Sequence, residues 1–415
     1  MRSVIVFVAA LAIVMAFGVE AMLPAFDEID AEFGFSERGL SVSLLVTSVL
    51  IGMGIGTLVW GPVSDRIGRR AALVTGLGIY VLGALLSALA PNLELVLLAR
   101  AVWGFGAAAP GSLRYAIARD LYDGDRMARV VTIATAVFLI GPLLMPIVGE
   151  VILQFGPWEA IAVVGAVLGL VLAGWSIRFG ETIPPAARRP LRFGPLFEAV
   201  GILARLRRAG GAIVASTCFF ASFFVWLGSA QPIIDRIYGR DDDFIWFFAT
   251  SGLAMSATLF VTNRLIRRVG TRRVALRASL AFVAVCTVGL VWSVGVGGLA
   301  LGPWFAWVLL ANSLGAVMSP VCAALALDPV GEIAGVTSAV LNFAALAIGG
   351  SLAAFVDARI EDTVTPMIAG SFVFGLLGAL TLWWSQASPA GSSTPPGSTT
   401  TADFSPPSGS IGRGR

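Results

Sequence analysis

The stretch GPVSDRIGRR at residues 61–70 decides the fold, because it is a short charged segment between two long apolar runs. One run covers about 40–61 and the other about 71–90. Each is long enough to cross a bilayer as a helix, which takes about 20 residues. The segment between them carries Asp65 and three Arg residues. We therefore predict two membrane-spanning helices whose connection faces the cytoplasm, because cytoplasmic loops are rich in Arg and Lys.

The same pattern of apolar runs continues along the whole chain. Hydrophobic residues make up 57% of the 415 residues and charged residues only 13%, about half of the roughly 25% that is usual in soluble proteins. This composition excludes a soluble enzyme, a disordered chain and a secreted disulfide scaffold. We predict an all-α membrane protein with twelve transmembrane helices at about 5–25, 40–61, 71–90, 94–117, 130–152, 158–177, 211–233, 244–264, 274–297, 303–327, 334–355 and 365–385.

The distribution of Arg predicts the orientation of these helices. Every basic residue of the chain is Arg, and 22 of the 28 lie in segments that face the cytoplasm if both termini are cytoplasmic. Four lie in the external loops, and Arg100 and Arg114 lie within a span. This asymmetry predicts a multi-pass protein of a bacterial inner (plasma) membrane with both termini in the cytoplasm.

An internal repeat divides the chain into two halves. VTNRLIRRVGTRR (261–273) follows the second span of the second half, as VSDRIGRR (63–70) does in the first half. We expect an N-terminal six-helix bundle at 1–178, a basic cytoplasmic linker at 179–210, a C-terminal six-helix bundle at 211–385 and a disordered tail at 386–415. Within the linker, Leu196, Phe197, Val200 and Leu203 share one face of a helix. That pattern is typical of an amphipathic helix on lipid headgroups, and a plain basic linker is the alternative.

Four stretches carry a resemblance to a known family. GPVSDRIGRR (61–70) is similar to the segment between helices 2 and 3 of the major facilitator superfamily. RAVWGFGAAAPGSLRYAIARDLYDGDRMARV (100–130), GPLLMPIVGE (141–150) and ALALDPVGEIAGVTSAVLN (324–342) resemble helix 4, helix 5 and the helix 10–11 connection of its drug–proton antiporters of the bicyclomycin and chloramphenicol resistance type. The chain departs from that pattern at Trp103, Met145 and Glu150. The resemblance implies two six-helix bundles with a substrate site between them.

Two charged residues within the apolar runs are the predicted proton-coupling groups. Glu20 lies in FGVEAMLPA (17–25), and an acid within a span costs about 2.5–3.5 kcal/mol on insertion scales, which makes it a functional hypothesis. It matches the helix 1 acid that the resemblance implies in drug and proton coupling; the alternative is an interfacial Glu20 at the end of a short helix. At 1.5 Å per residue, Glu20 and Arg100 lie about 8 and 9 Å from the external ends of their helices. An ion pair between them is therefore permitted, with a structural Arg100 as the alternative.

Further residues are assigned to the substrate cavity and to gating. The cavity residues share an apolar, aromatic or amide character suited to a hydrophobic ligand, with Arg114 as a basic group among them: Met22, Trp103, Arg114, Phe223, Trp226, Asn312 and Asn342. For the aromatic residues, contact with lipid or with the membrane interface is the alternative. The gating residues come from two of the resembling stretches, 61–70 and 141–150: Gly61, Asp65, Arg66, Gly68, Arg69, Pro146 and Gly149. The resemblance implies that Asp65 faces the start of helix 11, the span expected at 334–355, when the inner gate is shut. A solvated turn that only signals the topology is the alternative.

These features predict a transporter. Burial favours the protonated form of a carboxyl and a nearby Arg favours the ionised form, so Glu20 can load a proton from outside and release it inside. Glu150 is a candidate second acid, with an interfacial structural role as the alternative. The chain has no His and only single Cys residues, so we expect no metal, no cofactor and no enzymatic activity. We expect a monomer whose partners are a small-molecule substrate, protons and the lipid bilayer. We expect no binding of nucleic acid. We expect export of small hydrophobic compounds in exchange for protons by alternating access. A proton-coupled or passive transporter of a polar metabolite, and a non-transporting sensor, are the alternatives.

Overall fold

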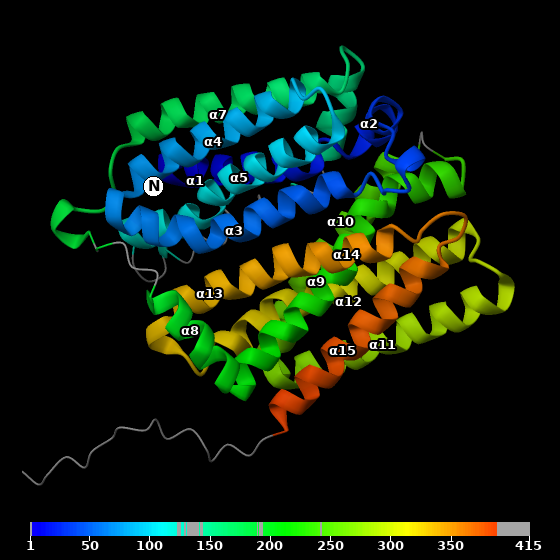
Figure 1. Cartoon of the computed structure of the whole chain (residues 1–415). Helices are drawn as coiled ribbons and strands as arrows, with labels where there is room; N and C mark the ends of the chain where they lie inside the picture. The colour runs from blue at the N-terminus through cyan, green and yellow to red at the C-terminus, as the bar shows by residue number, and fades with distance from the viewer. Residues whose placement is uncertain are drawn as a thin grey trace, which may run out of the picture.

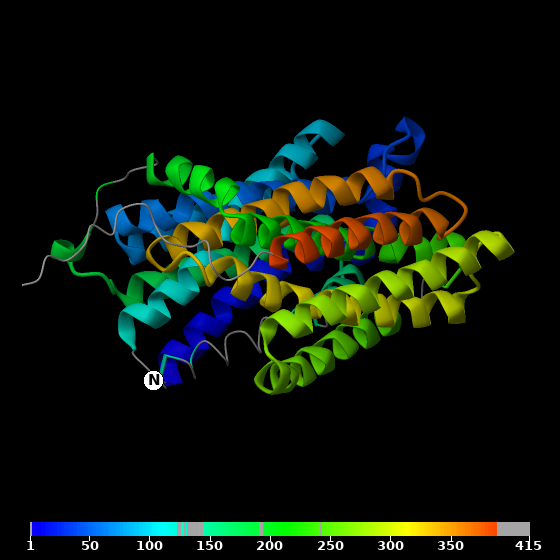
Figure 2. The same ribbon diagram turned by 90° about the horizontal axis from the view of Figure 1, so that it is seen from below.

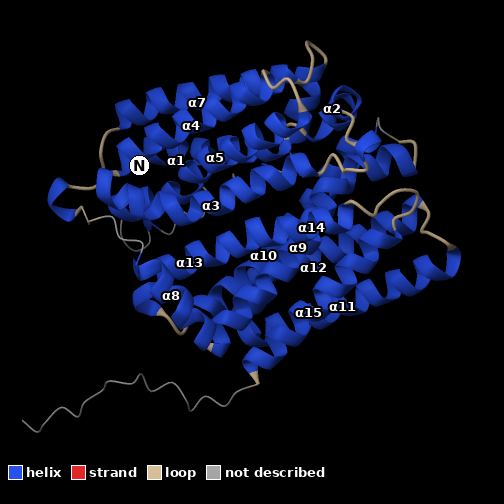
Figure 3. Cartoon of the chain, viewed as in Figure 1, coloured by secondary structure: helices blue, strands red, loops and turns tan. Residues whose placement is uncertain are grey.

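The computed structural model describes most of the chain as helix (Figure 3). It describes residues 2–387 apart from 123–125, 128–129, 131–140, 142–143, 189, 191–193 and 241–242. The predicted tail at 386–415 lies outside the described residues, except for its first two positions. Within the described part no strand is present (Figure 3).

The first half of the chain forms one group of helices. Its elements are α1 (Arg2–Glu20), η1 (Leu23–Ala25), α2 (Phe26–Phe33), η2 (Ser36–Arg38), α3 (Leu44–Ile67), α4 (Arg69–Ala88), α5 (Leu93–Leu121), the helix Leu144–Leu153 and α7 (Glu159–Phe179). In Figure 2, α1 runs obliquely from the N-terminus toward the middle of the molecule.

The second half forms another group, which lies beside the first in Figure 1. The connection between the groups contains η3 (Pro185–Ala187) and α8 (Gly194–Arg205). The elements that follow are α9 (Arg207–Pro232), the π-helical turn η4 (Ile233–Ile237), α10 (Phe244–Val269), α11 (Thr271–Val296), α12 (Leu301–Leu327), η6 (Gly331–Ile333), α13 (Ala334–Phe343), the π-helical turn η7 (Ala344–Ile348), α14 (Gly349–Asp357) and α15 (Thr365–Gln386).

This architecture confirms the predicted helical membrane fold. Eleven segments of the described part are long and apolar enough to cross a membrane. The span expected at 130–152 is described only in part, and its described portion includes the short apolar helix Leu144–Leu153. We call the end that carries the N-terminus and α8 the inner end, because we expect it to face the cytoplasm, and the end that carries α2 the outer end (Figure 1).

Two segments that we expected to be loops are largely helical. The acidic stretch after the first span forms α2, whose apolar residues Phe26 and Ile29 are fully buried. The stretch 61–70 belongs to α3 as far as Ile67, so only Gly68 separates α3 from α4. Gly68 has a φ of +97°, a backbone conformation that residues with a Cβ rarely adopt. A side chain there would also meet Glu181.

The linker helix α8 packs on the second half. Ala199 and Leu203 are buried, and Leu203 joins a cluster with Ala209, Val330 and Leu341. Phe197, by contrast, is 74% exposed. The four apolar residues of the predicted face are therefore divided between the protein and the solvent-accessible surface. Contact of the exposed part with lipid stays a prediction.

Helix α5 lies at the centre of the first group because glycine permits neighbouring backbones to approach it closely. A Cβ on Gly52 of α3 would lie 1.9 Å from the carbonyl oxygen of Ala101, and a Cβ on Gly104 would lie 2.1 Å from that of Val49. On the other side, a Cβ on Gly83 of α4 would lie 2.3 Å from the backbone nitrogen of Trp103. Small residues at helix contacts are a general device of membrane bundles.

Replacing Gly52 with Ala should therefore separate α3 from α5 and destabilise the protein by about 1–3 kcal/mol, the usual range for overpacking. The measurement is thermal unfolding of the purified protein in detergent. Gly78→Ala is the matched control, because Gly78 lies in α4 with nothing within 4 Å of the added Cβ. Equal melting temperatures for the two variants would contradict the close approach.

Candidate functional site

Arg100 is completely buried within the first group of helices. Its side chain has 0% exposure, and its Nη1 donates a hydrogen bond of 3.0 Å to the carbonyl oxygen of Gly18 in α1. The guanidinium carbon lies 4.9 Å from the centre of the Trp103 ring, which adds a cation–π contact. Its Nε and Nη2 have no hydrogen-bond partner among the described residues. Arg100 therefore carries unused donors in an apolar surrounding.

Glu20 is buried at the point where α1 ends. The residue is only 7% exposed, and Ala21 and Met22 after it are also buried. The helix thus stops at Glu20, as the interfacial interpretation supposes, but the chain stays inside the protein. Its Oε2 has no hydrogen-bond partner within the part of the chain that the structure describes. A Cβ on Gly141 would lie 3.8 Å from this oxygen, so the carboxyl group faces the fifth span.

Arg100 and Glu20 are not paired in this structure. Arg100 binds the carbonyl of Gly18, two residues before Glu20. No ion pair within 4.0 Å joins Glu20 to Arg100 in this structure, in which both residues are described. Both side chains keep polar atoms without a partner among the described residues.

The predicted cavity residues have different environments. Met22, Trp103, Arg114, Trp226 and Asn312 are buried, Phe223 is half-buried and Asn342 is exposed. Arg114 is only 4% exposed and donates to the hydroxyl of Tyr115 at 3.0 Å. Asn312 carries an amide nitrogen without a partner among the described residues. The assignment of these residues to one cavity stays a prediction.

The aromatic residues of α9 and α12 form an interior cluster. The ring of Trp226 lies 5.9 Å from that of Phe248 and 5.9 Å from that of Trp304, which itself is fully buried. Contact with lipid or with the membrane interface is the alternative for Trp226 in the sequence analysis, and it is wrong, because Trp226 is only 2% exposed. Trp226 and Trp304 are part of the core of the second group.

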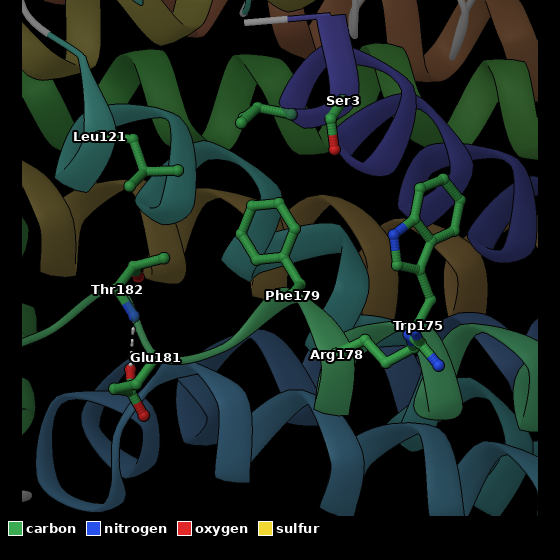
Figure 4. A pocket seen from close by; sticks show the side chains of 8 residues that line it. Ser3, Leu121, Trp175, Arg178, Phe179, Glu181 and Thr182 are labelled. Atoms are coloured by element: carbon green, nitrogen blue, oxygen red, sulfur yellow. Dashed lines mark hydrogen bonds between the residues drawn. The ribbon is translucent and has the colours of Figure 1, made fainter.

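A cavity of about 450 Å³ lies at the inner end, away from these residues. Figure 4 shows its lining, in which Trp175, Arg178 and Phe179 of α7 face Ser3 and Leu121. None of the predicted cavity residues lines it. Its polar edge is Glu181, whose Oε1 accepts from the backbone nitrogen of Thr182 at 3.0 Å (Figure 4).

Arg69 organises the inner end of the first group. Its side chain is 5% exposed and donates to Asp120 at 2.9 Å, to Asp65 at 2.7 Å and to the hydroxyl of Ser64 at 2.6 Å. Its backbone nitrogen donates to Glu181 at 2.8 Å. These bonds join α3, α4, α5 and the segment after α7. The predicted contact of Asp65 with helix 11 stays a prediction, since Asp65 binds Arg69 in this structure.

The remaining gating residues occupy several kinds of position. Arg66 is exposed and Gly61 is half-buried with open space around it. In the helix Leu144–Leu153, Pro146 and Gly149 are both buried. A Cβ on Gly149 would lie 1.9 Å from the carbonyl oxygen of Ala21, so this helix touches the chain directly after Glu20. Gly149 therefore sets the distance between the fifth span and the buried acid.

Charged residues also join the two groups of helices at the outer end. Arg236 in η4 donates to Asp30 at 2.6 Å, to Asp27 at 3.1 Å and to the hydroxyl of Ser36 at 3.0 Å. Gln231 donates to Asp27 as well. We call these five residues the outer latch. The sequence signal for it was present, since Arg236 is one of four Arg residues among the acidic external loops.

A second buried acid was not predicted from the sequence. Asp357 ends α14, is 4% exposed and accepts a hydrogen bond of 2.6 Å from the hydroxyl of Ser229 in α9. It follows the apolar run 334–355 directly, so its position resembles that of an ordinary loop acid. The signal in the sequence that could have drawn attention to Asp357 is that this acid lies directly at the margin of an apolar run.

Replacing Arg69 with Ala should destabilise the protein by about 3–5 kcal/mol, because it leaves the largely buried Asp120 without its cation. Unfolding of the purified protein in detergent measures the change. Arg70→Ala is the matched control, since Arg70 is the next residue along α4 and is exposed; surface substitutions usually stay within about 0.5 kcal/mol. A similar loss in both variants would show that the Arg69 network contributes little.

Solved structures share this fold. An inward-open structure of the xylose transporter XylE from E. coli superposes with a TM-score of 0.74 at 15% sequence identity, covering 94% of this chain and 97% of that one. The human organic anion transporter MFSD10 superposes with a TM-score of 0.65 at 18% identity, covering 92% and 98% of the two chains. At these identities the likeness shows the fold alone.

Relatives in sequence extend over most of the chain. A bicyclomycin resistance protein homolog of Haemophilus influenzae is 29% identical over 374 residues, covering 88% of this chain and 92% of the relative. The multidrug resistance protein MdtL of Salmonella heidelberg is 26% identical over 252 residues, covering 59% and 62%. The model of the Major Facilitator Superfamily matches residues 8–354. Together with the helical membrane fold, this match shows that the chain is a multi-pass membrane transporter, not an enzyme, and belongs to the Major Facilitator Superfamily.

Proposed function

We propose that this transporter exports small, largely hydrophobic compounds in exchange for protons. The observation that carries the proposal is the buried Glu20, whose carboxyl oxygen has no partner among the described residues. The names of the sequence relatives, which refer to bicyclomycin resistance and multidrug resistance, support the proposed substrate class.

Glu20 is suited to carry the proton because its two forms have different requirements. A neutral carboxylic acid is tolerated in an apolar interior, whereas a carboxylate there needs a cation or several hydrogen bonds. Arg100 binds the carbonyl of Gly18, two residues before Glu20 in the chain, and has two nitrogens without a partner among the described residues. When Glu20 releases its proton, Arg100 can turn from the carbonyl of Gly18 to the new carboxylate. Loss of the proton thereby changes the contact between α1 and α5.

The substrate class fits the chemistry of the interior. Buried aromatic and apolar side chains dominate the predicted cavity, and the polar groups among them are few, with Asn312 and Arg114 as examples. Pockets of this kind bind apolar ligands and use isolated polar groups to orient them. Arg114 and Tyr115 lie in the part of α5 nearer the inner end. The guanidinium of Arg114 contacts the Tyr115 ring.

Exchange requires that the site open to one side at a time. The outer latch holds α2 to η4, and the Arg69 network holds the inner ends of α3, α4 and α5 together. In the alternation that we propose, the outer latch breaks when the inner ends of the two halves meet. Asp65 then contacts the start of the eleventh transmembrane helix, which begins with α13. A negative charge is favoured at that helix N-terminus.

Glu20→Gln should abolish export and reduce drug resistance to the level of a host without the transporter, because a side-chain amide at this position cannot release a proton. Arg100→Ala should have the same effect through loss of the counter-charge. The measurements are a drug-susceptibility panel in an efflux-deficient host, and the proton release that follows addition of a drug to energised everted vesicles.

Glu94→Gln is the matched control, because Glu94 lies at the start of α5 with a largely exposed side chain. It should keep wild-type resistance. Unchanged resistance to every compound in wild type, Glu20→Gln and Arg100→Ala would remove the drug-export function. Substrate flux that persists in Glu20→Gln without proton movement would indicate passive transport of a metabolite instead.

A further inference from the structure

Asp357 lies where the two halves of the transporter meet at the outer end. Its carboxyl group accepts the hydrogen bond from Ser229 in α9, and the side chain of Ser43 lies next to the carboxyl group, beside Gly228. Ser43 precedes α3 and thus belongs to the first half, whereas Asp357 and Ser229 belong to the second. One buried carboxyl is therefore bonded to the second half and packed against the first.

Glycine makes this contact possible. A Cβ on Gly228 would lie 2.8 Å from Oδ2 of Asp357 and 2.8 Å from the Cβ of Ser43. The three residues thus fill one small volume between α9, α14 and the start of α3. Ser43 is itself 1% exposed and is bonded to the hydroxyl of Ser41 at 2.9 Å. Little space is left for water beside the carboxyl group.

No cation neutralises Asp357 among the described residues. The elements packed against α14 are α3, α9, η7 and α15. On α3 and α9 the charged residues are Asp65, Arg66, Arg207 and Arg208, all at the inner end, and η7 and α15 contain none. Arg359, two residues along the chain, is exposed and contacts Phe355. Two hydroxyl groups and no positive charge face the carboxyl.

This environment suits a neutral acid better than a carboxylate. A buried carboxylate without a cation is costly, whereas a protonated carboxyl can donate one hydrogen bond and accept another from the two hydroxyl groups. Opening the outer end moves Ser43 away with the first half and admits water. The ionised form then becomes the favoured one.

We propose that Asp357 takes up a proton from external water when the outer end closes and returns it when the outer end opens, so that external acid favours closure. The proton of a hydronium ion bonds to a carboxylate oxygen and leaves a water molecule behind. This inference rests on the alternating access of the proposed function, and it is separate from the role of Glu20. It gives an order to export, since the substrate leaves first and external acid then closes the empty transporter.

Spin labels on the two halves can measure the closure directly. Glu37→Cys and Glu361→Cys place labels on exposed outer positions of the first and second half, and the three native Cys residues are buried. Distances between the labels in the full-length protein give the ratio of outer-open to outer-closed molecules. In the wild-type background, lowering the pH from 8 to 5 should decrease this ratio by up to about tenfold per pH unit for one linked proton.

Three variants test the assignment to Asp357. Asp357→Asn, which imitates the neutral acid, should stay closed and, compared in a Glu20→Gln background that removes the other coupled proton, lose the pH dependence. Ser43→Ala should shift the population toward the open form at every pH and keep the dependence, which provides a test even if Asp357→Asn does not fold. Asp27→Asn is the matched control, because it neutralises a half-exposed acid of the outer latch, and it should also keep the dependence.

Two outcomes overturn the inference. One is a wild-type ratio that does not change with pH, and the other is an Asp357→Asn or Ser43→Ala protein that contradicts these expectations. Failure of the export function is distinguishable, because it is measured by drug and proton flux in Glu20→Gln. A transporter whose Glu20→Gln variant still exchanges drug for protons can still close through Asp357.

Discussion

The close approach of α5 to α3 and α4 is the constraint on which the rest of the structure depends. Gly52, Gly83 and Gly104 permit backbone contacts that no side chain would tolerate. These contacts hold α5 inside the first group and leave Arg100 without access to water or to lipid headgroups. The arginine must therefore find its partners within the protein. Its hydrogen bond to the carbonyl of Gly18 joins α5 to the last turn of α1, which ends at Glu20.

The charged groups divide into those that are satisfied and those that are not. Arg69 at the inner end and Arg236 at the outer end have several carboxylate and hydroxyl partners each. Glu20 and Arg100 between them keep unused atoms among the described residues. Well-bonded groups stabilise one arrangement of the helices, whereas incompletely bonded groups gain from a change. In the proposed mechanism, the bonds that hold one conformation therefore lie at the two ends, and the proton exchange lies between them.

Particular residues show how far the sequence predicted the candidate site. Glu20 and Arg100 stand out in the sequence because a charge within an apolar run has a high cost, and the structure buries both of them. Asp357 does not stand out, because it lies at the margin of a run and only the packing of α9 and α3 buries it. The outer latch likewise joins residues about 200 positions apart, a separation that no local pattern encodes. Whether Asn312, Phe223 and Trp226 share one cavity depends on the same long-range packing.

The sequence by itself determined the helical membrane fold, because a bilayer requires long apolar segments whose backbone groups are bonded internally. It also determined which charges are unusual, since the cost of a buried charge depends on residue type and on the surrounding run. Only the tertiary structure decided that α1 ends at Glu20 while the chain remains buried, that Arg100 binds a carbonyl instead of the acid, and that Asp357 is enclosed by both halves. These features depend on distances between helices far apart in the chain, and side-chain contacts across those distances are set by packing.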